Sequence, residues 1–95
     1  MFTGIVTDVG RIVAAEDVTP DLRRFRVACH YDPATIDLGA SIAHSGVCLT
    51  VTGRERTADG CIIQVETAAE TLRKTNARRW NAGQSLNLER SLKIG

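Results

Sequence analysis

The sequence is poor in aromatic residues and contains no long hydrophobic run. Only 4% of its 95 residues are aromatic. Aromatic side chains form the surfaces on which single-stranded nucleic acids stack, so a nucleic-acid partner is not expected. No apolar stretch approaches the roughly 20 residues that a membrane-spanning helix needs. The opening segment, MFTGIVTDVG, has no basic region before an apolar core, so we expect no signal peptide, no membrane attachment and a cytoplasmic location.

The sequence also has no large excess of positive or negative charge. The 12 Lys and Arg residues are nearly balanced by 11 Asp and Glu residues, which gives a formal net charge of +1. No overall field therefore attracts the protein to a polyanion. Basic residues do cluster locally, over 23–26 and 73–79. These clusters keep a nucleic-acid-binding barrel open as an alternative, which a steep salt dependence of oligonucleotide binding would support.

The cysteines form no metal-binding or disulfide pattern. There are three of them, Cys29, Cys48 and Cys61, and no pair is spaced as Cys-x-x-Cys. An odd number without such spacing predicts neither a disulfide framework nor a zinc site. We expect reduced thiols and no bound metal.

Alternation of apolar and polar residues recurs between turn signals about every ten residues, which is typical of a barrel or a sandwich. In the clearest segment, Phe25, Val27 and Cys29 are predicted to face the core. Strands are expected over 2–7, 11–15, 22–30, 40–43, 47–52, 61–67 and 84–90, with a turn at 8–10. Because closing the sheet removes exposed edges, these strands favour a Greek-key barrel, with Trp80 closing its base.

One short helix is predicted near position 70. The sequence Thr67-Ala-Ala-Glu70 has the form of a capping box, in which the two side chains satisfy backbone N–H groups at the helix start. We expect a helix from about Ala68 to Thr75, with basic residues near its negative end. The N–H groups at its start could bind an anion or the carbonyls of a heterocycle, or the capping box could occupy them itself.

The segment 47–52, Val-Cys-Leu-Thr-Val-Thr, carries the most chemical information. Its alternation places the two valines and the leucine on the core side, and Cys48, Thr50 and Thr52 on the opposite face. These three side chains could line a polar pocket, or they could be ordinary outer-face strand residues, which spacing alone favours. A nucleophilic role for Cys48 is not favoured, since no neighbouring charge that would lower its pKa can be identified.

The remaining titratable residues form no evident catalytic group. His44 is expected at a turn, where it is either a weak candidate for a general acid or base or a structural residue, and His30 is a weaker candidate. Glu66 and Glu70 flank a strand–helix junction and are not expected to act as a carboxylate pair. Spacing alone thus predicts a small β-barrel with a possible polar pocket and no catalytic machinery.

Four blocks in order, MFTGIV, GASIAHSGVCLTV, ETLRKTN and AGQSLNLERSLKIG, resemble the riboflavin synthase family and together cover nearly the whole chain. The match is to the amino-terminal lumazine-binding repeat. The resemblance implies an all-β fold, a six-stranded antiparallel barrel with one short helix. Residues 1–95 would form a single domain, one half of a two-repeat enzyme that assembles as a homotrimer.

The resemblance also implies an activity. Enzymes of this family are transferases that dismutate two molecules of 6,7-dimethyl-8-ribityllumazine. A four-carbon unit passes from one molecule to the other, which gives riboflavin and a pyrimidinedione. No metal or redox cofactor is required. The active site forms where the first barrel of one subunit faces the second barrel of its neighbour.

Ligand-contact residues can be carried over from the family's motifs. With the resemblance, Cys48 is interpreted as a packing and polarising contact rather than a nucleophile. The positions are Phe2 at the pocket mouth, Gly4, Ile5 and Val6 in the N-terminal contact strand, Ser41 at the ribityl chain, Cys48, Leu49 and Thr50 at the ring and ribityl chain, and Glu66, Thr67, Ala68, Ala69, Glu70 and Thr71, whose backbone reads the ring's polar edge.

The chain also departs from the family pattern. The family continues past the LKIG block into a Gly-Gly-His segment and a second barrel, and this sequence does not include them. We therefore expect the barrel to bind lumazine or riboflavin, turnover to be weak or absent, and two identical barrels to pair as a homodimer. The alternative is a non-catalytic lumazine- or flavin-binding module, although the Val-Cys-Leu-Thr-Val strand favours the enzyme.

Overall fold

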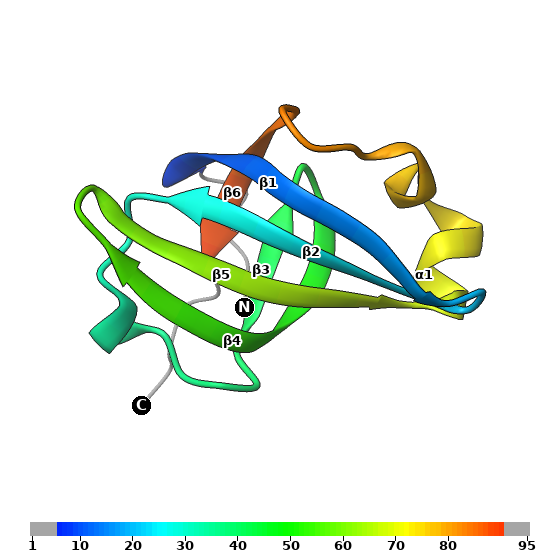
Figure 1. Cartoon of the computed structure of the whole chain (residues 1–95), viewed down its shortest axis with the longest axis horizontal. Coiled ribbons are helices and arrows are strands. Elements are labelled where there is room, and N and C mark those ends of the chain that lie inside the picture. The colour runs from blue at the N-terminus through cyan, green and yellow to red at the C-terminus, as the bar shows by residue number, and fades with distance from the viewer. Residues whose placement is uncertain (1–5, 91–95) are drawn as a thin grey trace.

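The computed structural model describes residues 6–90, which form a closed barrel of antiparallel strands in the order β1-β2-β5-β4-β3-β6 (Figure 1). The strands are β1 (Asp8–Thr19), β2 (Leu22–Cys29), β3 (Ser41–His44), β4 (Val47–Thr57), β5 (Gly60–Ala68) and β6 (Ser85–Arg90). The helical segments are α1 (Ala69–Lys74) and the 3-10 turns η1 (Pro33–Thr35) and η2 (Ala77–Arg79). The predicted all-β, six-stranded barrel with one short α-helix is confirmed for this part of the chain.

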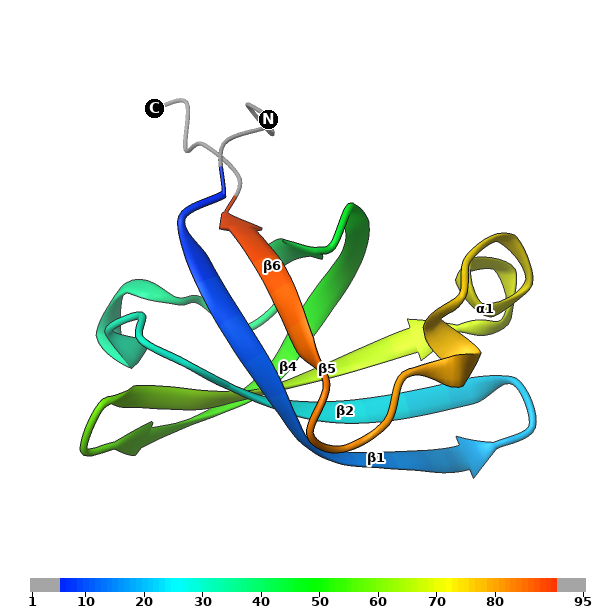
Figure 2. The same ribbon diagram turned by 90° about the horizontal axis from the view of Figure 1, so that it is seen from above.

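The strand order contains a Greek key. Hairpins join β3 to β4 and β4 to β5, and β6 then returns to lie beside β3, so that the spatial order is β6-β3-β4-β5. The long return connection carries α1 and η2, and Figure 2 shows α1 standing at the end of the barrel where β5 ends. Because β6 also pairs with β1, the sheet closes and neither edge is left unpaired.

Alternating side chains fill the barrel interior. On β2, Phe25, Val27 and Cys29 point inward as predicted, and each lies opposite an inward residue of β5. Trp80 is 2% exposed and packs on Phe25, with ring centroids 5.5 Å apart, which is consistent with its predicted place at an end of the barrel. Burial of such side chains contributes about 1.5–3 kcal/mol each, so this packed interior stabilises the barrel.

The predicted turn at 8–10 is wrong. These residues belong to β1, which runs without a break from Asp8 to Thr19. Gly10 suggested a turn, but a glycine suits the close packing inside β1: a Cβ atom there would lie 2.7 Å from Val27 Cγ1 and 2.8 Å from Leu88 Cδ1, so these side chains would have to shift. The predicted strand over 2–7 falls mostly outside the described residues, and Val6 and Thr7 are not in a strand.

The predicted capping box is also wrong, although the helix itself is confirmed to within a residue at each end. The residue before α1 is Ala68, which makes no side-chain capping bond. Thr67 still belongs to β5, and the alternation of that strand turns its side chain into the core, where it is 1% exposed. Glu70 instead forms ion pairs with Arg73 and Lys74, at 2.6 and 2.8 Å.

Candidate ligand-binding surface

The outer face of the β3–β4 hairpin presents three of the predicted contact residues together. Ser41 lies opposite Thr50 in the strand register, and Cys48 lies opposite Ala43. All three predicted side chains are exposed, whereas Leu49 is 3% exposed and points into the core. The predicted two-faced character of β4 is confirmed. The side chain of Leu49 cannot reach a ligand on the outer face, and only its backbone borders that face.

Neighbouring strands extend this face into a line of polar side chains. Thr50 lies opposite Glu66 on β5, and Glu66 lies opposite Arg24 on β2. Arg24 in turn lies opposite Glu16 on β1. Since adjacent strands are about 4.8 Å apart, these residues follow one another across the barrel surface. We call Ser41, Thr50, Glu66, Arg24 and Glu16 the outer-face row.

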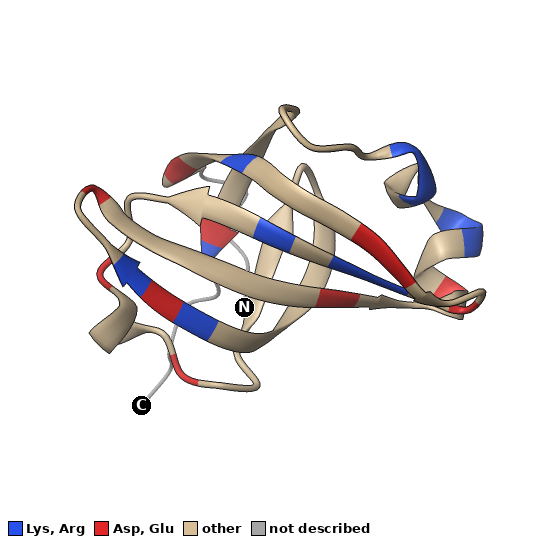
Figure 3. Cartoon of the chain, viewed as in Figure 1, with Lys and Arg blue, Asp and Glu red and all other residues tan. Residues whose placement is uncertain are grey.

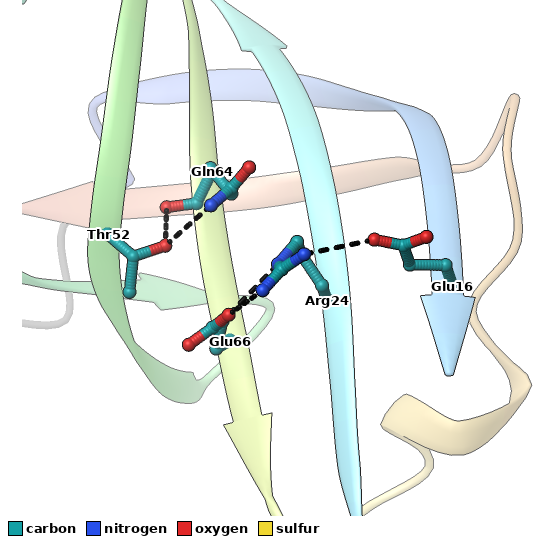
Figure 4. A network of polar contacts seen from close by, with 5 residues as sticks. All are labelled: Glu16, Arg24, Thr52, Gln64 and Glu66. Atoms are coloured by element: carbon teal, nitrogen blue, oxygen red, sulfur yellow. Dashed lines mark hydrogen bonds and ion pairs between the residues drawn. The ribbon is translucent and has the colours of Figure 1, made fainter. Parts of the chain in front are cut away.

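Charged contacts hold the second half of the outer-face row (Figure 4). The guanidinium of Arg24 donates to Glu66 Oε2 from Nε at 2.9 Å and from Nη2 at 2.7 Å. Its Nη1 donates to Glu16 Oε1 at 3.1 Å. The hydrogen bond to Glu66 raises the pKa of Arg24. Beside this group, Gln64 Nε2 donates to Thr52 Oγ1 at 3.1 Å.

His44 does not lie where the sequence suggested. It is the last residue of β3, not a turn residue, and it is 0% exposed because the alternation that buries Ile42 also turns His44 inward. Its Nδ1 lies 2.9 Å from the Ile42 carbonyl oxygen, and burial lowers the pKa of His44 to about 4. It is therefore neutral at neutral pH and does not reach the outer face.

The cysteines divide into two kinds. All three are free thiols; Cys48 is exposed on the outer face, and Cys29 and Cys61 are buried. The two buried sulfurs lie 3.4 Å apart in the core, and burial raises the pKa of Cys29 to about 12. Cys48 is thus the thiol that a ligand on the outer face could contact.

The segment 66–71 contributes its residues in different ways. The Glu66 side chain lies on the outer face, whereas the Thr67 side chain lies in the core with no hydrogen-bond partner within residues 6–90. Ala68 is exposed, Ala69 and Thr71 are half-buried, and Glu70 is held by ion pairs within α1. Of the side chains in this segment, the structure brings Glu66 next to the β3–β4 contact residues.

The N-terminal contact residues fall largely outside the described part of the chain. Phe2, Gly4 and Ile5 belong to residues 1–5 and are not described. Val6 is 50% exposed and precedes Thr7, whose backbone N–H donates to the Leu88 carbonyl at 2.9 Å. Leu88 pairs with the end of β3, so residue 7 lies at the β6 side of the hairpin that carries Cys48.

Three hollows lie on or near the candidate surface within residues 6–90. A hollow of about 30 Å³ borders Ser41, and one of about 400 Å³ borders Glu16 and Arg24 at the far end of the outer-face row. A further hollow of about 190 Å³ borders Arg26 and Gln64. Among the described residues, Cys48 and Thr50 line none of these hollows.

Basic residues are not gathered on this surface. Figure 3 shows Lys and Arg mixed with Asp and Glu along the strands, and a basic stretch over α1 and η2. Within 23–26, Arg23 is 8% exposed and bonds Asp17 at 2.9 Å, and Arg26 bonds Glu55 at 2.7 Å. These carboxylates offset the charge that a phosphate backbone would require, so this cluster gives little support to the nucleic-acid alternative.

Two other kinds of site are not evident in residues 6–90. No helix there is long and apolar enough to span a membrane. No group of three or more His, Cys, Asp or Glu side chains there is arranged to hold a metal ion.

Comparisons with known proteins identify a family and a set of relatives. The lumazine binding domain family model matches residues 3–91. The chain is 46% identical to riboflavin synthase of Brucella abortus (strain 2308) over 96 residues, which cover 100% of the chain and 47% of that protein. It is 35% identical to riboflavin synthase of Escherichia coli (strain K12), with 99% of the chain and 42% of that protein covered. It is 36% identical to riboflavin synthase of Mycobacterium tuberculosis (strain CDC 1551 / Oshkosh), with 100% and 45% covered. The chain thus spans about half the length of the curated relatives it matches.

Proposed function

The chain belongs to the lumazine binding domain family, and from this premise we propose that it is the amino-terminal barrel of a riboflavin synthase and binds 6,7-dimethyl-8-ribityllumazine or riboflavin. The ligand would lie on the outer face of β3, β4 and β5. The observation that carries this proposal is the alignment of Ser41, Thr50 and Glu66 on three successive strands, with Cys48 on the same face.

The chemistry of the ligand fits these side chains. A ribityl chain carries several hydroxyl groups, each of which both donates and accepts hydrogen bonds. Ser and Thr hydroxyls can do the same, and a carboxylate accepts. Ser41, Thr50 and Glu66 therefore offer a series of partners to a chain of hydroxyls laid across the strands. The lumazine ring, with carbonyl and N–H groups on its edge, would take backbone partners near residues 66–71, and Cys48 would pack against the ring.

The reaction requires more than one bound ligand. Dismutation needs two lumazine rings face to face, so that a four-carbon unit can leave one molecule and join the other. One barrel would seat one lumazine and leave the second ring face uncovered. We expect the second lumazine to be presented by another barrel, which in the family is the second repeat of a neighbouring subunit of the trimer. Barrels of this chain alone would pair as a homodimer and turn over weakly or not at all, in a cytoplasmic setting and without a metal or redox cofactor.

A second candidate is a non-catalytic lumazine- or flavin-binding module. The observation that favours it is the burial of His44, which removes the stronger of the two histidine candidates for acid–base chemistry from the ligand surface. The two candidates share the binding step and differ in turnover. Production of riboflavin by the chain together with the remaining half of a family enzyme would support the enzyme, and binding without production would support the module.

A fluorescence titration tests the binding step. Riboflavin and 6,7-dimethyl-8-ribityllumazine are titrated separately into the purified chain, with its oligomeric state measured in the same buffer. We expect saturable binding at one ligand per chain. If the folded chain binds neither compound at any oligomeric state, the proposed function is wrong for this barrel.

A further inference from the structure

The outer-face row continues beyond Glu66 to residues that lie outside the proposed ligand surface. Arg24 is the next member on β2, and Glu16 follows on β1. Their strands lie on the far side of β5 from the β3–β4 hairpin. Arg24 therefore contacts the proposed surface through Glu66 rather than through the hairpin.

The contact between Arg24 and Glu66 is directional. Arg24 Nε and Nη2 both donate to the same carboxylate oxygen, Glu66 Oε2, at 2.9 and 2.7 Å. The side chains of Arg24 and Glu66 are 32% and 25% exposed, so water competes with these bonds less than at a fully exposed pair. Two charge-assisted bonds from one planar guanidinium hold this oxygen on the β2 side and limit the directions in which the carboxylate can point.

The second carboxylate oxygen of Glu66 is left on the side of the hairpin. Figure 4 shows this oxygen turned away from Arg24, towards the strand that carries Thr52, which is β4. Thr50 is the residue of β4 directly opposite Glu66, and Ser41 is opposite Thr50 on β3. The fixed carboxylate thus presents an acceptor at the end of a line of two hydroxyl groups.

We infer that Arg24 is a positioning residue: it orients the Glu66 carboxylate so that Ser41, Thr50 and Glu66 act together on a ligand with a chain of adjacent hydroxyl groups. The inference rests on the proposed function and adds a residue that determines specificity for the hydroxyl chain. Arg24 itself does not touch the ligand. Glu16, bonded to Arg24 Nη1 at 3.1 Å and 63% exposed, gives the guanidinium weaker support from β1.

The choice of arginine follows from this role. A guanidinium offers several N–H groups in one plane and can direct two of them at one carboxylate, whereas lysine offers a single ammonium group. The hydrogen bond to Glu66 also raises the pKa of Arg24, so its charge does not vary over the pH range of the protein. We therefore expect Arg24→Lys to replace Arg24 only in part.

The test compares two ligands that differ in the hydroxyl chain. 6,7-Dimethyl-8-ribityllumazine and 6,7,8-trimethyllumazine, which carries a methyl group in place of the ribityl chain, are titrated by fluorescence into the wild-type chain and four variants. The variants are Arg24→Met, Arg24→Lys, Glu66→Gln and the double variant of Arg24→Met with Glu66→Gln. The matched control is Arg26→Met, which removes an arginine two positions along β2 that pairs with Glu55 at 2.7 Å instead of with the row. Circular dichroism and thermal unfolding confirm that each variant is folded.

We expect Arg24→Met to weaken binding of the ribityl compound roughly five- to tenfold, as expected when one hydrogen bond of typical net strength is lost. Binding of the trimethyl compound should stay within twofold of wild type. Glu66→Gln should have a similar effect, Arg24→Lys a smaller one, and the double variant no more than the larger single effect. Arg26→Met should bind both compounds as wild type does. A merely structural role for Arg24 would lower the affinities for both compounds together.

The outcomes separate this inference from the proposed function. If wild type prefers the ribityl compound and Arg24→Met keeps the same preference, the inference is wrong and the proposed function stands. If the two single losses add in the double variant, Arg24 does not act through Glu66 and the inference is equally wrong. If the folded wild type binds neither compound, the proposed function fails and the positioning role fails with it.

Discussion

At the scale of single residues, burial decides which side chains can take part in chemistry. His44 and Thr67 are the two polar residues of the β3 and β5 ends that point into the core, at 0% and 1% exposed. Both carry a polar atom without a hydrogen-bond partner in residues 6–90, which is His44 Nε2 in one case and Thr67 Oγ1 in the other. Such atoms cost stability, so these two positions are expected to tolerate apolar replacement better than most polar sites.

His44 gives the protein a pH-dependent stability. Its pKa is about 4 in the folded state and 6.5 unperturbed, so the unfolded chain binds more protons between these values. The contribution of neutral His44 is fully present above pH 6.5 and is lost as the pH falls towards 4. We expect the free energy of unfolding to drop by roughly 2 kcal/mol between pH 7 and pH 5 from this group. Urea unfolding of wild type and His44→Leu at both values measures it as the difference between the two proteins.

The comparison with His44→Leu is needed because other groups also contribute to the pH dependence of stability. Asp8 raises the pKa of His30, which acts in the opposite direction, and Asp8 itself has a lowered pKa, whose effect falls below this window. Asp8 and His30 are both present in wild type and in His44→Leu, so their contributions cancel. An equal drop in the two proteins would contradict a buried neutral His44.

Thr50 tests the polar surface one hydroxyl at a time. Thr50→Val keeps a β-branched side chain on an exposed strand position, so the fold should be unchanged. We expect binding of 6,7-dimethyl-8-ribityllumazine to weaken by roughly 0.5–1.5 kcal/mol, the worth of one hydrogen bond. Thr52→Val, on the same face of β4 but bonded to Gln64, is the matched control. Unchanged affinity in Thr50→Val would show that the Thr50 hydroxyl takes no part in binding the ligand.

Substitution of Cys48 distinguishes a thiol that only contacts the ligand from one that acts as a nucleophile. If the thiol only packs against the ring, Cys48→Ser, which keeps a small polar group on the exposed strand, should bind the ribityl compound within a few-fold of wild type. The same fluorescence titration measures it. A complete loss of binding by the folded variant would assign Cys48 a more demanding role than packing.

At the scale of elements, local sequence patterns predicted where the strands lie. The candidate site depends on pairing between strands that are distant in the sequence. Period-two alternation predicted that Phe25 faces the core and Thr50 faces outward, because successive side chains of one strand point to opposite faces of the sheet. It could not predict which strands would be neighbours. The alignment of Thr50 with Glu66 and of Glu66 with Arg24 depends on the register between strands, which is set by packing of the whole barrel.

Misleading local signals explain the errors in the predicted elements. Asp8-Val-Gly10 has the composition of a turn, but Gly10 serves close packing inside β1. Thr67 and Glu70 have the spacing of a capping box, but burying Thr67 at the end of β5 outweighs a capping bond. His44 lies beside the Ser45-Gly46 turn, and one position separates an exposed turn residue from a buried strand residue. In each case tertiary packing outweighs the local preference.

The close packing around Gly10 predicts that even an alanine side chain at this position lowers the stability of the fold. In Gly10→Ala the new Cβ would meet Val27 and Leu88 side chains at 2.7 and 2.8 Å, so β1 must shift or the core must adjust. We expect a loss of about 1–3 kcal/mol in the free energy of unfolding, measured with urea. Gly53→Ala is the control, since its Cβ would lie 3.4 Å from Gln64 Cβ, at the limit of ordinary contact. Equal stability of Gly10→Ala and wild type would favour an irregular turn at this position.

At the scale of the whole molecule, a closed barrel leaves its outer face as the place for a ligand. The core is filled by side chains, and the candidate residues Ser41, Cys48 and Thr50 all lie outside it. We expect a ring bound there to contact this barrel on one side and a ligand held by a second barrel on the other, as a reaction between two identical molecules requires. We therefore expect riboflavin formation to require a second barrel and not merely a higher ligand concentration.

The most direct test of the central claim is to map the bound ligand on the chain by ¹H–¹⁵N nuclear magnetic resonance. Saturating 6,7-dimethyl-8-ribityllumazine should shift the amide signals of the outer face of β3, β4 and β5, with the largest changes around Ser41, Cys48, Thr50 and Glu66. A rival surface exists on the same barrel, the hollow of about 320 Å³ beside Val9, His30 and Thr57. Shifts centred on that hollow, with the β3–β4 hairpin unchanged, would contradict the account.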